Sequence, residues 1–151
     1  MINMKVVIVS DSHGEIDLLR KIVNQNLDAD VFLHLGDSQL PEDYLNPFCS
    51  VKGNCDFFVP YPSYRILHTP YGDFYCEHGH LRGGITPEFL RIRQCIGYLY
   101  GHTHCRKNEV REGIHFINPG SLTRPRDGLS GSYIVMMCEK DKLEIKYIEI
   151  D

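Results

Sequence analysis

The sequence predicts one α/β domain in which two β-sheets pack face to face. In the first half, short apolar runs typical of buried parallel strands alternate with a helical pattern. After residue 104, strand-like runs follow one another through turns, and residues 144–150 alternate polar and apolar side chains as a half-buried strand does. The 151 residues suffice for one domain with a substantial core. Because no linker, repeat or low-complexity stretch divides the chain, we expect a single domain over residues 1–151.

A βαβ unit opens the chain. Residues 4–9 and 31–35 are continuous apolar runs, and residues 15–26 between them place apolar side chains on one helical face. A right-handed crossover makes the two strands parallel, so their carboxyl ends meet at one edge of the sheet. Asp11 and Asp37 follow these strands and are expected at that edge, where open α/β sheets bind ligands.

The later elements are expected in a regular order. A short helical turn within residues 38–47 precedes strands at residues 48–51, 64–68, 73–76, 95–100, 107–111, 114–117, 132–138 and 143–150. Prolines interrupt regular structure between residues 57 and 70, where we expect the chain to cross to the second sheet. Residues 81–84 are expected to form a loop. Thr86 and Pro87 suit the N-cap and first position of a helix that runs to about residue 94.

Composition narrows the function classes. The net charge of −4 is scattered along the chain, which gives no electrostatic footprint for nucleic acid or a membrane surface but leaves a nucleotide possible as substrate. No stretch reaches the ~20 apolar residues that a membrane span needs, and the first apolar run is too short for a signal peptide. The six cysteines include no CxxC pair. These features predict a reduced, cytoplasmic protein.

Polar side chains that bind metals follow successive strand-like runs. Two imidazoles lie in the loop Gly101-His102-Thr103-His104, and the complete set is Asp11, His13, Asp37, Asn54, His78, His102 and His104. Nitrogen and oxygen ligands without thiolate suit divalent Mn, Fe, Ni or Zn. Seven ligands exceed what one ion takes, so two ions are expected, with Asp37 as the bridge. A polar loop with incidental histidines is the alternative interpretation of the HxH sequence alone.

The order of these motifs resembles the calcineurin-like metallophosphoesterase superfamily. The matching segments are Asp11-x-His13, Gly36-Asp37, Gly53-Asn54, His78-Gly79-His80 and Gly101-His102-x-His104. The small, capless YfcE-like phosphodiesterase branch also shares Gly53-Asn54-Cys55-Asp56 and Asn118-Pro119-Gly120-Ser121. The resemblance covers nearly the whole chain. It implies a four-layer α/β/β/α sandwich of two mixed sheets, the metallo-dependent phosphatase fold, without a cap domain.

The resemblance also implies a ligand set and a reaction. One ion would be held by Asp11, His13, Asp37 and His104, and the other by Asp37, Asn54, His78 and His102. Mn is the expected metal, with Ni, Fe, Co, Zn and Mg as alternatives. A hydroxide that bridges two divalent ions would hydrolyse a phosphate ester, with Asp37 and Asn54 among the catalytic residues. A diester is favoured over a monoester, and the substrate class is a small phosphate ester or nucleotide.

Neighbouring residues have two interpretations each. Cys55 stands where much of the superfamily has a histidine that assists the leaving group, so that assistance falls to His80 or to neither residue. Asp56 is expected to orient a ligand loop rather than simply follow a turn. Asn118 and Gly120 either offer groups to a phosphate or form a turn that supports the HxH loop. Arg124 and Arg126 either attract an anionic substrate or are simply solvated.

A non-catalytic scaffold is the competing function. A related eukaryotic branch with this fold serves as a subunit of a sorting coat, and its ligand positions are altered. All seven positions hold competent ligands here, which favours the enzyme. A homo-oligomer formed through the β-rich C-terminal half is a further expectation.

Overall fold

The computed structural model describes residues 3–81 and 84–150, in which the strands form two five-stranded mixed sheets. The first sheet has the order β10 (Leu143–Glu149), β9 (Ser132–Cys138), β1 (Met4–Val9), β2 (Val31–His34) and β3 (Phe48–Ser50). The second has the order β4 (Tyr64–His68), β5 (Asp73–Glu77), β6 (Gly97–Leu99), β8 (Ile114–Pro119) and β7 (Arg106–Arg111). Each expected strand is present. Residues 82–83 of the expected loop lie outside the described residues.

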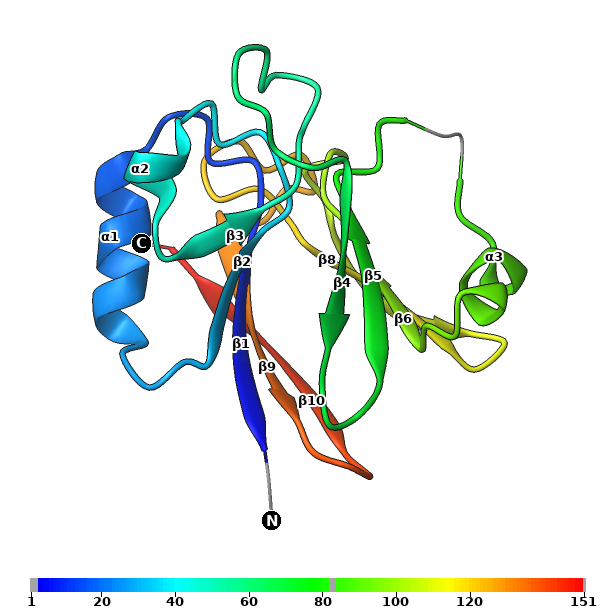
Figure 1. Ribbon diagram of the computed structural model, residues 1–151. Helices are drawn as coiled ribbons and strands as arrows, with labels where there is room; N and C mark the ends of the chain where they lie inside the picture. Colours follow the sequence, from blue (N-terminus) through cyan, green and yellow to red (C-terminus); the bar gives the residue numbers. More distant parts are fainter. Residues whose placement is uncertain (1–2, 82–83, 151) are drawn as a thin grey trace.

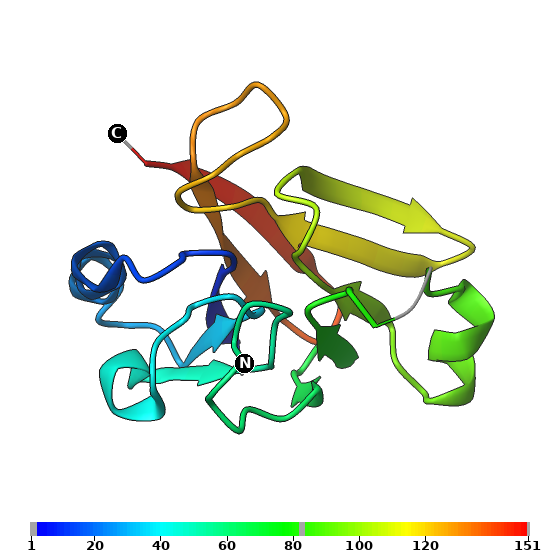
Figure 2. The ribbon, with the colours of Figure 1, turned by 90° about the horizontal axis from the view of Figure 1, so that it is seen from above.

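Helices cover the outer faces of both sheets. Helix α1 (Ile16–Gln25) and the short α2 (Glu42–Leu45) pack on the first sheet, and α3 (Pro87–Ile92) packs on the second. Figures 1 and 2 show α1 and α3 at opposite sides of the molecule with the two sheets between them. The arrangement is the expected α/β/β/α sandwich. Thr86 caps α3 as expected, since its hydroxyl oxygen accepts the Phe89 backbone N–H at 3.2 Å.

Three apolar layers hold the sandwich together. The central layer lies between the sheets, where Val6 and Ile8 of β1 share a core with Phe74 of β5 and Leu99 of β6. These side chains are completely buried. Because burial of a large apolar side chain contributes about 1.5–3 kcal/mol, this layer fixes how the sheets face each other. It therefore also fixes how the loops of the two sheets meet.

Strand direction brings the functional loops to one end of the sandwich. β1 pairs in parallel with β2, and β2 with β3, while in the other sheet β5, β6 and β8 are parallel neighbours. The carboxyl ends of these strands lie at the upper end in Figure 1, where their loops gather. Both sheets thus contribute loops to one site.

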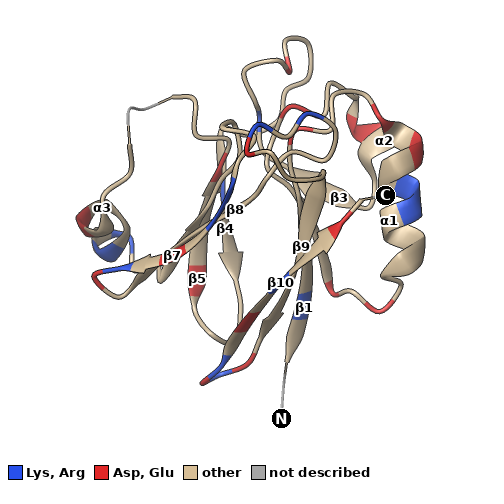
Figure 3. Cartoon of the chain, turned by 180° about the vertical axis from the view of Figure 1, so that it is seen from behind, with Lys and Arg blue, Asp and Glu red and all other residues tan. Residues whose placement is uncertain are grey.

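Two surface properties complete the description. Within residues 3–81 and 84–150, no helix is long and apolar enough to cross a membrane. Figure 3 shows acidic and basic residues distributed over both halves of the molecule.

Candidate metal centre

The seven expected ligands lie in loops whose backbone is unusually shaped. Five of them have a positive φ, a conformation that side-chain-bearing residues seldom adopt and that clusters at functional sites. They are Asp11 (φ 53°), His13 (47°), Asp37 (61°), His102 (67°) and His104 (61°). This backbone turns successive side chains in different directions, so the two histidines of the HxH loop face different targets. The pattern favours a built site over an incidental polar loop.

Backbone hydrogen bonds lock the first two loops together. The Asp11 N–H donates to the carbonyl of Gly36, and the His13 N–H donates to the carbonyl of Asp37, both at 3.0 Å. The HxH loop joins them because the His102 N–H donates to Asp11 Oδ2 at 3.1 Å. Gly101 is required at this junction, since a Cβ there would overlap the Ser10 side chain.

One cluster forms around the carboxylate of Asp11. Its Oδ1 atom lies 3.1 Å from Nε2 of His104 and 3.9 Å from Nε2 of His13. Asp11, His13 and His104 each offer an atom within 4.8 Å of the other two. These residues, with Asp37, form the first ligand set that the sequence predicts.

A second cluster lies beside it. Nε2 of His78 is 3.3 Å from Oδ2 of Asp37 and 3.0 Å from Oδ1 of Asn54. Asp11 also reaches this cluster, with its Oδ1 atom 3.8 Å from His78 Nε2. The His102 ring centroid is 5.0 Å from that of His78. The structure thus brings the second predicted ligand set together.

In three of the histidines, the ring nitrogen that points away from the site, Nδ1, faces an oxygen acceptor. Nδ1 of His78 faces the Leu35 carbonyl and Nδ1 of His104 the Arg124 carbonyl, both at 2.7 Å. Nδ1 of His13 faces Oε1 of Gln39 at 2.9 Å. Each acceptor requires the proton on Nδ1, which leaves the Nε2 lone pair directed into the site. Metal-binding histidines are oriented in this way.

The unpaired atoms fit a cation. Within the described part of the chain, His13 Nε2 is buried without a hydrogen-bond partner, and Asp11 Oδ1 faces the Nε2 atoms of His13, His78 and His104. A carboxylate oxygen and an imidazole lone pair repel one another unless a proton or a metal ion lies between them. The residues therefore suit a divalent metal bound by nitrogen and oxygen.

Charge coupling shifts the pKa values of the same groups. Burial raises the pKa of Asp11, but hydrogen bonding to His104 and the charge of His78 lower it more, so it falls below its usual value. Burial also raises the pKa of Asp37, but the hydrogen bond to His78 lowers it more, so this pKa too falls below its usual value. The hydrogen bond to Asp11 raises the pKa of His104. Because its pKa is raised, a proton and a metal ion would compete for Nε2 of His104.

His80 lies next to the second cluster. Its ring centroid is 5.4 Å from that of His78 and 6.2 Å from that of His102. Burial and the charges of those two histidines lower its pKa, which favours the neutral ring. In the described residues its Nδ1 atom is buried without a partner. His80 therefore sits beside the site, and its role stays a prediction.

Cys55 lies beside the carboxylate of Asp37. Its backbone N–H donates to Asp37 Oδ1 at 2.8 Å, and its thiol lies within 4.8 Å of ligand atoms of His13 and Asp37. Burial and the Asp37 charge raise the pKa of the Cys55 thiol. A protonated thiol is a poor metal ligand, because the thiolate is the binding form.

Asp56 supports the ligand loops from behind. Its carboxylate accepts the backbone N–H groups of Asp37 (2.9 Å), Gln39 (2.9 Å) and Gly53 (2.8 Å). It is 1% exposed, so these bonds are shielded from water. This is the positioning role that the sequence predicts for it.

Residues 118–120 support the HxH loop. The buried Asn118 amide donates to the Gly101 carbonyl and to the Thr103 hydroxyl oxygen, both at 3.1 Å. Its Oδ1 atom accepts the Gly120 N–H at 2.9 Å, so that N–H is already used. The geometry favours the supporting turn over direct contact with a phosphate.

One contributor was not anticipated from the sequence, namely Gln39, which holds His13 in place. Arg124 and Arg126 lie together at a small surface pocket of about 140 Å³. The pocket is also lined by His13, Asp37, Asn54, Cys55, His102 and His104. Gln39 follows Asp37 by two residues, but no feature of its sequence surroundings marks it as a partner of His13.

Comparisons with known proteins identify the family of this chain. The model of the calcineurin-like phosphoesterase superfamily domain matches residues 4–141. The probable metallophosphoesterase YsnB of Bacillus subtilis (strain 168) is 33% identical over 97% of this chain and 91% of its own length. The phosphodiesterase YfcE of Escherichia coli (strain K12) is 30% identical over 94% of this chain and 91% of its own length. The chain belongs to the calcineurin-like phosphoesterase superfamily, whose members are metal-dependent hydrolases of phosphate esters.

Solved structures share the architecture. A predicted phosphoesterase from Streptococcus pneumoniae TIGR4 superposes with a TM-score of 0.89 at 25% identity, covering 99% of this chain and 91% of that one. Vps29 of Entamoeba histolytica in complex with Zn²⁺ has a TM-score of 0.71 at 19% identity, covering 98% of this chain and 99% of that one. The Vps29 likeness shows the fold alone.

Proposed function

We propose that this protein is a two-metal phosphodiesterase whose substrate is a small phosphate ester or a nucleotide-type ester, with a diester favoured over a monoester. The observation that carries the proposal is the convergence of imidazole lone pairs and carboxylate oxygens in two adjoining clusters. Asp11, His13 and His104 form one, and Asp11, Asp37 and His78 form the other. Asp37 also approaches His13, which supports its role as the residue shared by two ions.

We divide the ligand set between two ions as the family resemblance implies. One ion would be held by Asp11, His13, Asp37 and His104, and the other by Asp37, Asn54, His78 and His102. Bound divalent ions supply Lewis acidity that activates water, and positive charge that orients and neutralises the phosphate. Mn²⁺ is the proposed metal because the mixed nitrogen and oxygen donors suit a borderline divalent ion.

The chain's own residues supply the remaining functions. The Nδ1 acceptors of His13, His78 and His104 keep three imidazoles aimed inward before substrate arrives. Arg124 and Arg126 line the pocket and can attract the anionic ester. His80, which favours the neutral form, is placed beside the second cluster and could exchange a proton with the ester oxygens.

Metal-dependent turnover tests the proposal. Chelator-stripped protein is mixed with bis(p-nitrophenyl) phosphate or p-nitrophenyl phosphate, and Mn²⁺ is then added back. We expect Mn²⁺ to restore hydrolysis, with a higher kcat/KM for the diester. The absence of hydrolysis with Mn²⁺, Ni²⁺, Co²⁺, Fe²⁺, Zn²⁺ or Mg²⁺, despite calorimetric evidence of bound metal, would contradict it.

A non-catalytic scaffold is the alternative function. The fold shared with Vps29 is the observation in its favour. Metal binding without turnover, together with a partner whose binding depends on the metal, would support this alternative.

A further inference from the structure

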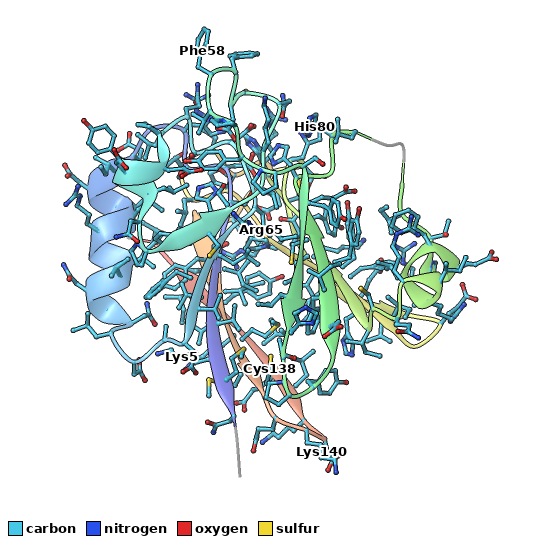
Figure 4. All side chains as sticks on the ribbon, viewed as in Figure 1. Lys5, Phe58, Arg65, His80, Cys138 and Lys140 are labelled. Carbon is cyan, nitrogen blue, oxygen red and sulfur yellow. The ribbon has the colours of Figure 1, made fainter. Side chains whose placement is uncertain are left out.

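The loop between β3 and β4 carries two adjacent phenylalanines that the fold does not bury. Phe57 is 72% exposed and Phe58 is 96% exposed. Their rings contact edge to face with centroids 6.5 Å apart. Figure 4 shows Phe58 at the tip of this loop, at the same end of the sandwich as His80 and opposite Lys140. Two adjacent exposed aromatic rings offer a flat apolar surface on which another aromatic ring can stack.

This loop is connected to the candidate metal centre rather than merely near it. Asp56 immediately precedes Phe57, and its carboxylate holds the backbone N–H groups of Asp37 and Gly53 at 2.9 and 2.8 Å. The preceding residue, Cys55, donates its own N–H to Asp37 Oδ1 at 2.8 Å. The base of the phenylalanine pair is therefore held at a fixed position relative to the carboxylates.

An apolar pocket of about 380 Å³ lies beneath the two rings. It is lined by Gln39, Pro41, Cys55, Phe57, Phe58 and Val59, in addition to Asp56. Cys55 also lines the small pocket of the metal centre, so the two hollows share a wall. An ester whose phosphorus atom lies over the metal ligands can extend one substituent past Cys55 into the apolar pocket.

We propose that Phe57 and Phe58 form a specificity subsite that binds a planar aromatic group on one ester oxygen of the substrate. This inference rests on the proposed function and adds the substrate class to it. The arginines beside His104 contact the charged phosphate end, whereas the phenylalanine pair covers the ring at the other end. An aryl ring and a nucleobase share the required chemistry, because each has a flat apolar face that stacks on an aromatic side chain.

Direct binding tests the subsite without requiring turnover. Calorimetry measures the Kd values of phenylphosphonate and methylphosphonate for the Mn²⁺-loaded protein. The two ligands carry the same charged group, so the ratio of their Kd values reports the contribution of the aromatic ring to binding. We expect phenylphosphonate to bind about 10-fold more tightly to the wild type, as a stacked aromatic contact implies. In the F57A/F58A variant the preference should fall to about 2-fold or less.

Two controls keep the outcome specific. Phe57→Leu keeps the apolar loop and should retain part of the preference, and Leu27→Ala removes another exposed apolar side chain, 79% exposed, at the end of α1. A second ligand pair, adenosine monophosphate and ribose 5-phosphate, tests whether a nucleobase gains the same advantage as a phenyl ring. Tighter binding caused by either the phenyl ring or the nucleobase supports the subsite if this tighter binding is lost in F57A/F58A.

An unchanged phenyl-to-methyl ratio in F57A/F58A overturns the proposal. In that case a dependence of the sedimentation coefficient on the two phenylalanines would identify a second copy of the chain as the occupant of the patch. Failure of the proposed function is a separate result. In that case added metal does not restore hydrolysis, although the wild type still binds phenylphosphonate more tightly than methylphosphonate.

Discussion

Nε2 of His104 lies 3.1 Å from Oδ1 of Asp11, while Nδ1 of the same ring faces the Arg124 carbonyl at 2.7 Å. With Nδ1 protonated, the short contact at Nε2 requires a positive charge between the two atoms. A proton meets this need in the metal-free protein, and a metal ion meets it in the loaded protein. The pair therefore links the electrostatics of the folded chain to its proposed cofactor.

The first prediction concerns this pair. His104→Ala should lower kcat/KM for the diester by more than about 100-fold, since even residues that only support a ligand contribute 10–100-fold. Asp37→Asn should have a similar effect because it removes a charge that both clusters approach. Steady-state kinetics and Mn²⁺ titration calorimetry measure the two losses.

His68 provides the matched control for these ligand variants. It is exposed at the end of β4 and pairs with Asp73 at 2.9 Å, away from the loops of the site. His68→Ala should leave turnover and Mn²⁺ affinity unchanged. Near-native turnover of His104→Ala at saturating metal would refute the ligand assignment, provided circular dichroism shows that the variant is folded.

The second prediction concerns Asp56. Asp56→Asn replaces an acceptor of three backbone N–H groups by an amide that repels at least one of them. We expect Mn²⁺ affinity to fall by about 10–100-fold and the free energy of unfolding to fall by about 1–3 kcal/mol. Metal titration and urea unfolding measure the two effects, with exposed Asp43→Asn in α2 as control. Unchanged metal affinity would show that Asp56 only stabilises the turn.

The third prediction concerns Cys55. Its backbone N–H donates to Asp37 Oδ1, and its nearby thiol favours the protonated form because burial and Asp37 raise its pKa. Cys55→Ser keeps the backbone contact and the size of the side chain, so kcat/KM should change by less than about 3-fold, a small effect for a neighbour of metal ligands. A loss as large as that of His104→Ala would assign the thiol a direct role. Cys55→His should increase hydrolysis of the monoester relative to the diester.

The fourth prediction concerns the buried His34 at the end of β2. Its Nδ1 accepts the Gly36 N–H at 3.1 Å, and its Nε2–H donates to the Ser12 hydroxyl oxygen at 2.9 Å. Burial lowers its pKa from 6.5 to about 4, so the folded state holds this ring neutral. Between these values the unfolded chain binds the extra proton. Stability from this residue is therefore complete above pH 6.5 and is lost as the pH falls toward 4.

Urea unfolding of the metal-free protein at several pH values checks this prediction. Between pH 7 and 4.5 the wild type should lose roughly 2 kcal/mol more than His34→Gln, since each unit of pKa difference corresponds to about 1.4 kcal/mol. His78 and His104, whose pKa values are raised, act in the opposite direction in both proteins and cancel in the comparison. If the free energy of unfolding changes equally with pH in the two proteins, His34 is not held neutral by the folded state.

Periodicity and strand ends predicted most of the fold. The run at residues 4–9, the helical face before residue 26 and the run at residues 31–35 defined β1, α1 and β2 because apolar spacing reports which face is buried. Element ends moved by a few residues, as in β8, which continues to Pro119. Terminal residues depend on contacts with other elements, which a local pattern does not contain.

Ligand types and order in the sequence predicted which residues meet at the metal centre, because parallel strands deliver their following residues to one edge. Tertiary structure alone decided the rest. The positive φ values of Asp11 and His104, the Gln39 acceptor at Nδ1 of His13 and the approach of His104 to Asp11 depend on contacts between loops that are far apart in the sequence. Such contacts join residues that are distant in the sequence and therefore leave no local pattern. Residue type and spacing thus indicate which side chains can act as ligands, while packing determines how those side chains are oriented.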